Sequence, residues 1–191
     1  MTGPAEILQE LERSGDAVLP RRMDDKDLAA AREELGALMA TAGWGSGFDG
    51  TRTKRVWALL ARTRCMDRVA LDRLVLDVVE QAIGPSAQFS LTYATQVHPG
   101  QGAQALHYEQ GIYPLPRDRD VMLTAIWALD DVEMPAGSVL LFSGRLYHGA
   151  GANTTTRPRF ACCRSGFRSY SASTSHPPIS GSSTASIPVN G

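Results

Sequence analysis

The feature that most constrains this chain is the hexapeptide LHYEQG at residues 106–111, in which an imidazole and a carboxylate stand two residues apart. In an extended segment the side chains of residues i and i+2 share one face, so His107 and Glu109 converge while Tyr108 points away. Both side chains can bind a metal ion. An H-x-E pair by itself is more typical of a surface pair or a satisfied core histidine, so the metal interpretation depends on its surroundings.

A second histidine, His148, lies far downstream, and with His107 and Glu109 it completes a set of two histidines and one carboxylate. Such a facial triad with open positions suits non-haem Fe(II). The residues after His148 are typical of a strand, a polar turn centred at residues 153–154 and a returning strand. This hairpin would place Arg159 opposite His148, where a guanidinium can bind a carboxylate bidentately.

These stretches resemble the phytanoyl-CoA dioxygenase family. The resemblance lies in QALHYEQG at residues 104–111, WALDD at residues 127–131 and MPAGSV at residues 134–139, and it continues to Arg159. The family consists of Fe(II)- and 2-oxoglutarate-dependent oxygenases on a double-stranded β-helix. The resemblance therefore implies an α+β fold, a cupin-like jelly roll with N-terminal helices packed on its sheet.

The resemblance also assigns the residues of the site. The iron ligands, which are also the catalytic residues, would be His107, Glu109 and His148. The keto-acid end of 2-oxoglutarate would chelate Fe(II), while its distal carboxylate pairs with Arg159 or, as the second candidate, Arg157. O2 would be the other co-substrate and ascorbate the reductant. A tryptophan at the position of Trp127 lies near the co-substrate in the family. Apart from the resemblance, the position of His98 just before the metal turn makes it a possible fourth ligand, although the proline and glycine after it favour a turn histidine.

The third ligand departs from the family pattern, which normally has aspartate where this chain has Glu109. Glutamate is one methylene longer and can still bind the metal. Relatives that halogenate replace this acid with a small residue, which leaves a coordination position for chloride. Glu109 therefore favours hydroxylation over halogenation.

Two longer segments also depart from the family. Relatives carry further strands between the positions of Asp131 and Met134, so one or two strands of the β-helix are expected to be missing here. The segment from Ser165 onward is roughly a third serine and contains prolines, a composition typical of disorder. We therefore predict an oxygenase-like domain over residues 1–164 and a disordered tail over residues 165–191.

The composition restricts the partners. With 191 residues and a formal net charge of −1, the chain is expected to form one ordinary soluble domain. Its 19 basic and 20 acidic residues give no electrostatic footprint for nucleic acid or an anionic membrane, so the expected partner is a small molecule. Three cysteines match neither a disulfide framework nor a zinc spacing, and the first twenty residues lack a signal peptide or a membrane span. A cytoplasmic location is expected.

Hydrophobic periodicity predicts the main elements. Helices are expected over residues 5–13 and 26–40, followed by one main helix that Asp67 caps and Gly84 ends. Strands are expected over residues 16–20, 87–97, 121–129 and 139–142. Charges on the main helix, including Asp72, and a basic cluster at residues 51–55 are interpreted as solvated. The glycine-rich residues 43–50 are interpreted as a flexible loop with two aromatic anchors.

Two other functions stay open. One is a degraded, non-catalytic β-helix that keeps the metal motif as a binding module but has lost part of its pocket wall. The other is a cupin-like metal enzyme that does not use 2-oxoglutarate, for which Arg159 would be dispensable. Iron-dependent turnover of 2-oxoglutarate separates both from the oxygenase.

Overall fold

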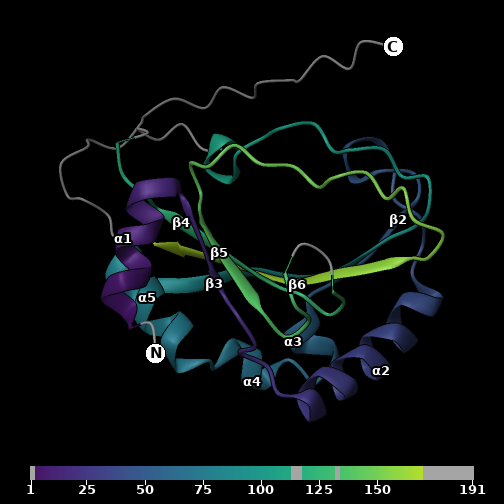
Figure 1. Cartoon of the computed structure of the whole chain (residues 1–191), viewed down its shortest axis with the longest axis horizontal. Coiled ribbons are helices and arrows are strands. Elements are labelled where there is room, and N and C mark those ends of the chain that lie inside the picture. Colours follow the sequence, from purple (N-terminus) through teal and green to yellow (C-terminus); the bar gives the residue numbers. More distant parts are fainter. Residues whose placement is uncertain (1–2, 113–117, 132–133, 170–191) are drawn as a thin grey trace, which may run out of the picture.

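A six-stranded sheet organises the computed structural model, which describes residues 3–112, 118–131 and 134–169 (Figure 1). The strands are β1 (Asp16–Leu19), β2 (Thr53–Trp57), β3 (Ala87–Val97), β4 (Met122–Trp127), β5 (Val139–Ser143) and β6 (Arg159–Ser169). Their order across the sheet is β1-β5-β4-β6-β3-β2, and every neighbouring pair is antiparallel. The last strand of the described chain therefore lies in the middle of the sheet.

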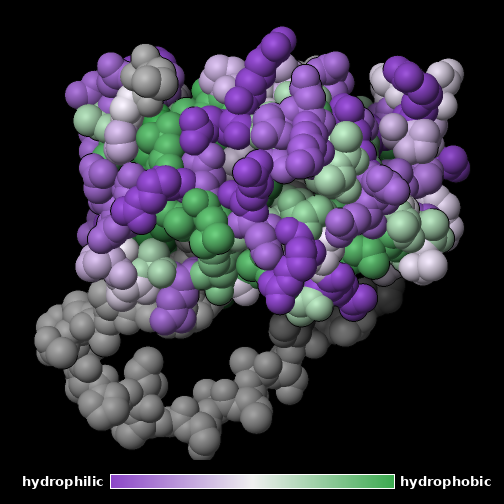
Figure 2. Space-filling view, turned by 90° about the horizontal axis from the view of Figure 1, so that it is seen from below, coloured by the Kyte–Doolittle hydropathy of each residue, from purple (hydrophilic) through white to green (hydrophobic). Residues whose placement is uncertain are grey.

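Helices α2 to α5 lie on one face of this sheet, below it in Figure 1, and α1 lies at the left of the sheet. The α-helices are α1 (Pro4–Ser14), α2 (Asp25–Thr41), α3 (Leu59–Arg62), α4 (Asp67–Ala70) and α5 (Arg73–Ile83), and the 3-10 helices are η1 (Gly47–Asp49) and η2 (Glu109–Ile112). Seen from the helical side, the surface is mostly hydrophilic with scattered apolar patches (Figure 2). The helices are thus amphipathic, and their apolar faces turn toward the sheet.

The core lies between these helices and the sheet. Ile7 of α1, Leu35 of α2 and Val78 of α5 are fully buried, as are Ala125 of β4 and Leu141 of β5. Removing this much apolar surface from water is the main favourable term in folding. The predicted packing of N-terminal helices on the sheet is confirmed.

The predicted main helix is divided in two. Leu71 is 70% exposed and, with Asp72, separates α4 from α5. The Asp72 side chain accepts a hydrogen bond from the Val75 amide at 3.0 Å and pairs with Arg22 at 2.8 Å. Asp72 therefore caps α5 and is not a solvated charge. The backbone amides in the first turn of a helix lack acceptors within the helix, and the Asp72 carboxylate supplies one.

Two long segments cover the opposite face of the sheet, teal and green at the top of Figure 1. Residues 98–107 and 148–153 run side by side in opposite directions: the Gly100 amide donates to the Asn153 carbonyl and the Asn153 amide to the Gln101 carbonyl, both at 2.9 Å. The predicted hairpin pairing of His148 with Arg159 is wrong. The earlier segment supplies the hydrogen-bonding partner of residues 148–153, and Arg159 instead opposes Val97 of β3.

The sheet extends beyond the predicted domain boundary. The backbone of residues 165–169 continues β6 between β3 and β4, so the boundary expected at residue 164 falls inside a strand. Residues 170–191 of the predicted tail lie outside the described residues. In the described part of the chain, none of the helices is long and apolar enough to cross a membrane.

Candidate metal centre

The two histidines of the predicted triad face each other across the paired segments. The His107 amide donates to the His148 carbonyl at 2.9 Å, and the His148 amide donates to the His107 carbonyl at 2.8 Å. Next to this pair, the Gln104 amide donates to the Ala150 carbonyl at 2.8 Å. This backbone register brings the two imidazole centroids to 4.3 Å from each other.

Each imidazole is oriented by a carbonyl two residues earlier in the chain. Nδ1 of His107 lies 3.1 Å from the Ala105 oxygen, and Nδ1 of His148 lies 3.0 Å from the Leu146 oxygen. A proton on each Nδ1 satisfies these carbonyls and leaves the Nε2 lone pairs available for a metal, as in most histidine metal sites.

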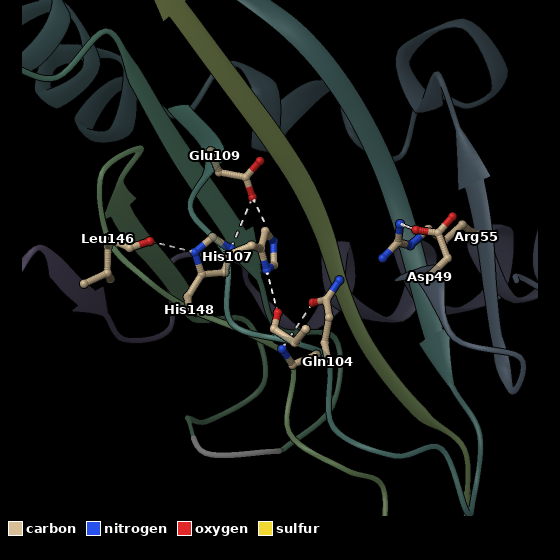
Figure 3. Close-up of polar contacts among 9 residues, drawn as sticks. Asp49, Arg55, Gln104, His107, Glu109, Leu146 and His148 are labelled. Atoms are coloured by element: carbon tan, nitrogen blue, oxygen red, sulfur yellow. Dashed lines mark hydrogen bonds and ion pairs between the residues drawn. The ribbon is translucent and has the colours of Figure 1, made fainter. Parts of the chain in front are cut away.

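Glu109 completes the cluster from the first residue of η2. Its Oε1 lies 3.1 Å from Nε2 of His148 and 3.7 Å from Nε2 of His107 (Figure 3). The three ligand atoms all lie within 4.8 Å of one another. Among the residues that the structure describes, this is the one cluster of at least three histidine, cysteine or acidic side chains that could share a metal ion. The predicted convergence of His107 and Glu109 is present.

The cluster is mostly shielded from water. The side chains of His107, Glu109 and His148 are 23%, 19% and 20% exposed. Burial lowers the pKa of His148, and the Leu146 carbonyl only partly offsets this effect. His148 is therefore neutral at physiological pH, which is the form of imidazole that ligates a metal. Two imidazoles and one carboxylate fit the donor set of non-haem Fe(II).

Aromatic rings flank both imidazoles. The Phe48 ring meets the His107 ring edge-on at a centroid distance of 4.7 Å, and the buried Phe142 ring lies 4.5 Å from the His148 ring. Phe48 belongs to the glycine-rich residues 43–50, for which the sequence predicted only a flexible loop with aromatic anchors. Its contact with His107 joins two segments that are almost sixty positions apart, which periodicity along one segment cannot reveal.

Gln110, which the sequence analysis did not single out, connects the metal segments. Its side chain is 3% exposed, with Nε2 donating to the Arg119 carbonyl at 3.2 Å and Oε1 accepting from the Val121 amide at 3.1 Å. Its own amide donates to the Gly144 carbonyl at 2.8 Å. Gln110 thus ties the turn that carries Glu109 to β4 and to the end of β5.

The remaining candidates differ in position. Arg159 is half-buried and donates through Nη2 to the Gly151 carbonyl at 2.8 Å, whereas Arg157 is exposed. Trp127, predicted near the co-substrate, is 1% exposed and belongs to the hydrophobic core, because a large apolar ring in a central strand is most stable there. His98 packs edge-on against Trp44 and lies within 3.0 Å of the Gln96 amide oxygen, as a turn histidine.

A cavity of about 200 Å³ adjoins the centre. Thr53 and Arg55 of β2, Thr95 and Val97 of β3, and the paired segments that lead into both histidines form its walls. Arg55 forms an ion pair with Asp49 there, and its side chain is 16% exposed (Figure 3). The basic cluster at residues 51–55 is therefore not uniformly solvated.

Three comparisons with known proteins bear on this site. The sequence pattern of the family described as Phytanoyl-CoA dioxygenase (PhyH) matches residues 131–161, a stretch that contains His148 and Arg159. Dioxygenase ALT11 of Alternaria alternata is 26% identical over 205 residues, which cover 81% of this chain and 68% of that protein. Dioxygenase FUM3 of Gibberella moniliformis is 24% identical over 206 residues, with the same two coverages of 81% and 68%.

Solved structures share the fold. HygX of Streptomyces hygroscopicus, solved with nickel, 2-oxoglutarate and hygromycin B, superposes with a TM-score of 0.70 at 17% identity, over 86% of this chain and 87% of that one. The non-haem α-ketoglutarate-dependent carbocyclase SnoK from nogalamycin biosynthesis gives a TM-score of 0.73 at 16% identity, over 88% and 86% of the two chains.

Proposed function

Because the chain belongs to the phytanoyl-CoA dioxygenase-like family of Fe(II)- and 2-oxoglutarate-dependent dioxygenases, we propose that His107, Glu109 and His148 are its iron ligands. The observation that supports this most strongly is the convergence of two Nε2 atoms and one carboxylate oxygen within 4.8 Å. Each imidazole is already oriented by its Nδ1 contact, so little conformational entropy is lost when a metal binds.

Fe(II), when bound, supplies the activation of O2, which is coupled to decarboxylation of 2-oxoglutarate to succinate and to oxidation of the substrate. The side chains supply geometry, charge and exclusion of water. Phe48 and Phe142 pack against the imidazoles and limit the approach of water to them. Glu109 keeps a carboxylate at the third ligand position, so we infer hydroxylation in preference to halogenation.

We assign the distal carboxylate of 2-oxoglutarate to Arg159, with Arg157 as the second candidate. Residues directly opposite in an antiparallel pair share a face, so Arg159 shares a face with Val97, which lines the cavity. The Nε of Arg159 is buried and has no hydrogen-bond acceptor in the described part of the chain. A carboxylate could satisfy it, and Arg157 offers no comparable donor because its side chain is exposed.

We also propose that the fold is a double-stranded β-helix that lacks one or two strands of its second sheet. The paired residues 98–107 and 148–153 would be what remains of that sheet, opposite the six-stranded one. The alignments support a shortened barrel. The alignment with ALT11 is 205 positions long but contains only 81% of this 191-residue chain. The relative therefore carries residues that are missing from this chain within the aligned region.

The substrate is proposed to be a small organic molecule, in line with the hygromycin B bound to HygX. The test is the conversion of 2-oxoglutarate to succinate by purified protein with Fe(II) and ascorbate, measured with and without a panel of metabolites. Turnover that requires Fe(II) and rises with one metabolite supports the oxygenase. A protein that binds iron tightly but never consumes 2-oxoglutarate would instead be the non-catalytic binding module.

A further inference from the structure

The cavity beside the metal centre is lined by Arg55, a cation other than the arginine assigned to the co-substrate. Its walls run directly into the centre, because the Gln104 and Ala150 backbones that line it are two or three residues from His107 and His148. Phe48 lines the cavity and also touches the His107 ring. A molecule in this space therefore lies next to the proposed iron ligands.

Arg55 is built into the cavity wall from β2. Its guanidinium lies over the Tyr93 ring at 5.2 Å and over the Trp57 ring at 5.8 Å, and these two rings contact each other at 4.6 Å. Such stacking fixes the plane of the guanidinium and leaves its edge to bind a partner. The Nε of Arg55 is buried and has no acceptor within the described residues, so Asp49 does not saturate the donors of this side chain.

The partner that Arg55 holds in the structure is itself a carboxylate. Asp49 comes from the 3-10 helix η1, between Gly47 and Gly50, both of which have the positive φ angles that favour glycine. The Asp49 side chain is more exposed than Arg55. A carboxylate on a short, exposed turn can be exchanged for the carboxylate of a ligand, whereas Arg55 is held by the sheet and the two aromatic rings.

Arg159 and Arg55 stand on different strands, β6 and β2, with β3 between them. In the proposed function Arg159 pairs with the distal carboxylate of 2-oxoglutarate, so Arg55 is left for another anion. The apolar surface next to Arg55 consists of Trp57 and Tyr93, and Phe48 lies on the way to the centre.

We propose that Arg55 binds a carboxylate of the oxidised substrate, displacing Asp49, and that the substrate is an organic acid with an apolar or aromatic body. This inference rests on the proposed function, because it requires 2-oxoglutarate to occupy Arg159. In this proposal Arg55 selects the substrate, and Asp49 pairs with Arg55 when no substrate is bound.

The probes are 3-phenylpropionate and octanoate, each compared with its neutral amide of the same shape. Protein loaded anaerobically with Fe(II) and 2-oxoglutarate is titrated with each probe, and binding is followed by the visible charge-transfer absorption of the complex and by tryptophan fluorescence. At least one acid should bind about tenfold more tightly than its amide, as expected for a charge-assisted pair. Arg55→Gln should reduce this preference to about twofold or less, while Arg55→Lys retains part of it.

Two further variants separate a binding role from a structural one. Asp49→Asn should strengthen acid binding several-fold, because it removes the competing carboxylate, whereas disruption of a purely structural pair would weaken it. Arg52→Gln removes the same charge from an exposed position three residues away and should leave the preference for acids intact.

The outcomes also separate this inference from the proposed function. If Fe(II) and 2-oxoglutarate give no charge-transfer absorption with the wild-type protein, both fail. If that absorption appears but no acid binds, or acids and amides bind alike, only the role of Arg55 is overturned. It is also overturned if Arg55→Gln weakens 2-oxoglutarate binding as much as Arg159→Gln, because Arg55 would then serve the co-substrate.

Discussion

The metal centre depends on three side chains whose donor atoms lie close together, so the loss of any one should lower the affinity for Fe(II). Replacing His107, Glu109 or His148 by alanine should weaken Fe(II) binding by about tenfold or more in an anaerobic titration. His98→Ala is the matched control, because His98 contacts Trp44 outside the cluster. Equal Fe(II) affinity in all three variants and the wild type would show that these residues are not the iron ligands.

The two arginines near the end of the described chain differ in exposure, and the co-substrate should distinguish them. Arg159→Ala should weaken 2-oxoglutarate binding by roughly thirtyfold or more and leave Fe(II) binding nearly intact, as expected for a partly buried charge-assisted pair. Isothermal titration with 2-oxoglutarate measures this loss. Arg157→Ala, two residues away and exposed, is the control. A larger loss with Arg157→Ala would reverse the assignment.

Single residues were predictable where chemistry is local. The two-residue spacing of His107 and Glu109, together with His148, identified a cluster that the structure brings together. Arg55 was missed because residues 51–55 were interpreted by composition alone. Alternation along β2 would have placed Arg55 on the face of Thr53 and Trp57, apart from Lys54.

At the level of elements, the turn after Glu109 depends on one buried amide. Gln110→Ala removes the partners of the Arg119 carbonyl and the Val121 amide, which should cost about 1–3 kcal/mol of stability if both stay buried. Because the same turn carries Glu109, Fe(II) affinity should also fall several-fold, and titration of the folded variant measures this. Gln88→Ala, on an exposed position of β3, should change neither quantity. A loss of stability with unchanged Fe(II) affinity would mean that Gln110 supports the fold but not the metal centre.

The sequence predicted whether a segment is a helix or a strand better than it predicted which segment lies beside it. The strand over residues 87–97 and the first two helices match their predicted ranges closely, because their apolar periods are regular. The register of residues 148–153 was not predictable, since their partner, residues 98–107, has no strand pattern and lies more than forty positions away. Periodicity indicates the type of an element and does not identify the element beside it.

At the level of the whole molecule, β6, the last strand along the described chain, joins the two halves of the sheet. β6 pairs with β3 and β4, so the two halves of the sheet meet only through it. Such non-local pairing is slow to form, and it makes the fold depend on residues near the end of the described chain. The boundary at residue 164 was predicted from composition. Composition could not place it correctly, because a serine-rich segment can still contribute backbone hydrogen bonds to a sheet.

Two truncations test this dependence. A chain that ends at Arg164 loses the backbone of residues 165–169, which pairs with β3 from Ala87 to Thr92 and with β4 from Met122 to Ala125, so it should unfold or aggregate. A chain that ends at Tyr170 should keep its melting temperature within about 2 °C of the full chain, because residues 171–191 contain few large apolar side chains to bury. Circular dichroism and size-exclusion chromatography measure both. If the chain ending at Tyr170 melts as early as the one ending at Arg164, residues 171–191 pack on the domain and supply surface that the shortened barrel lacks.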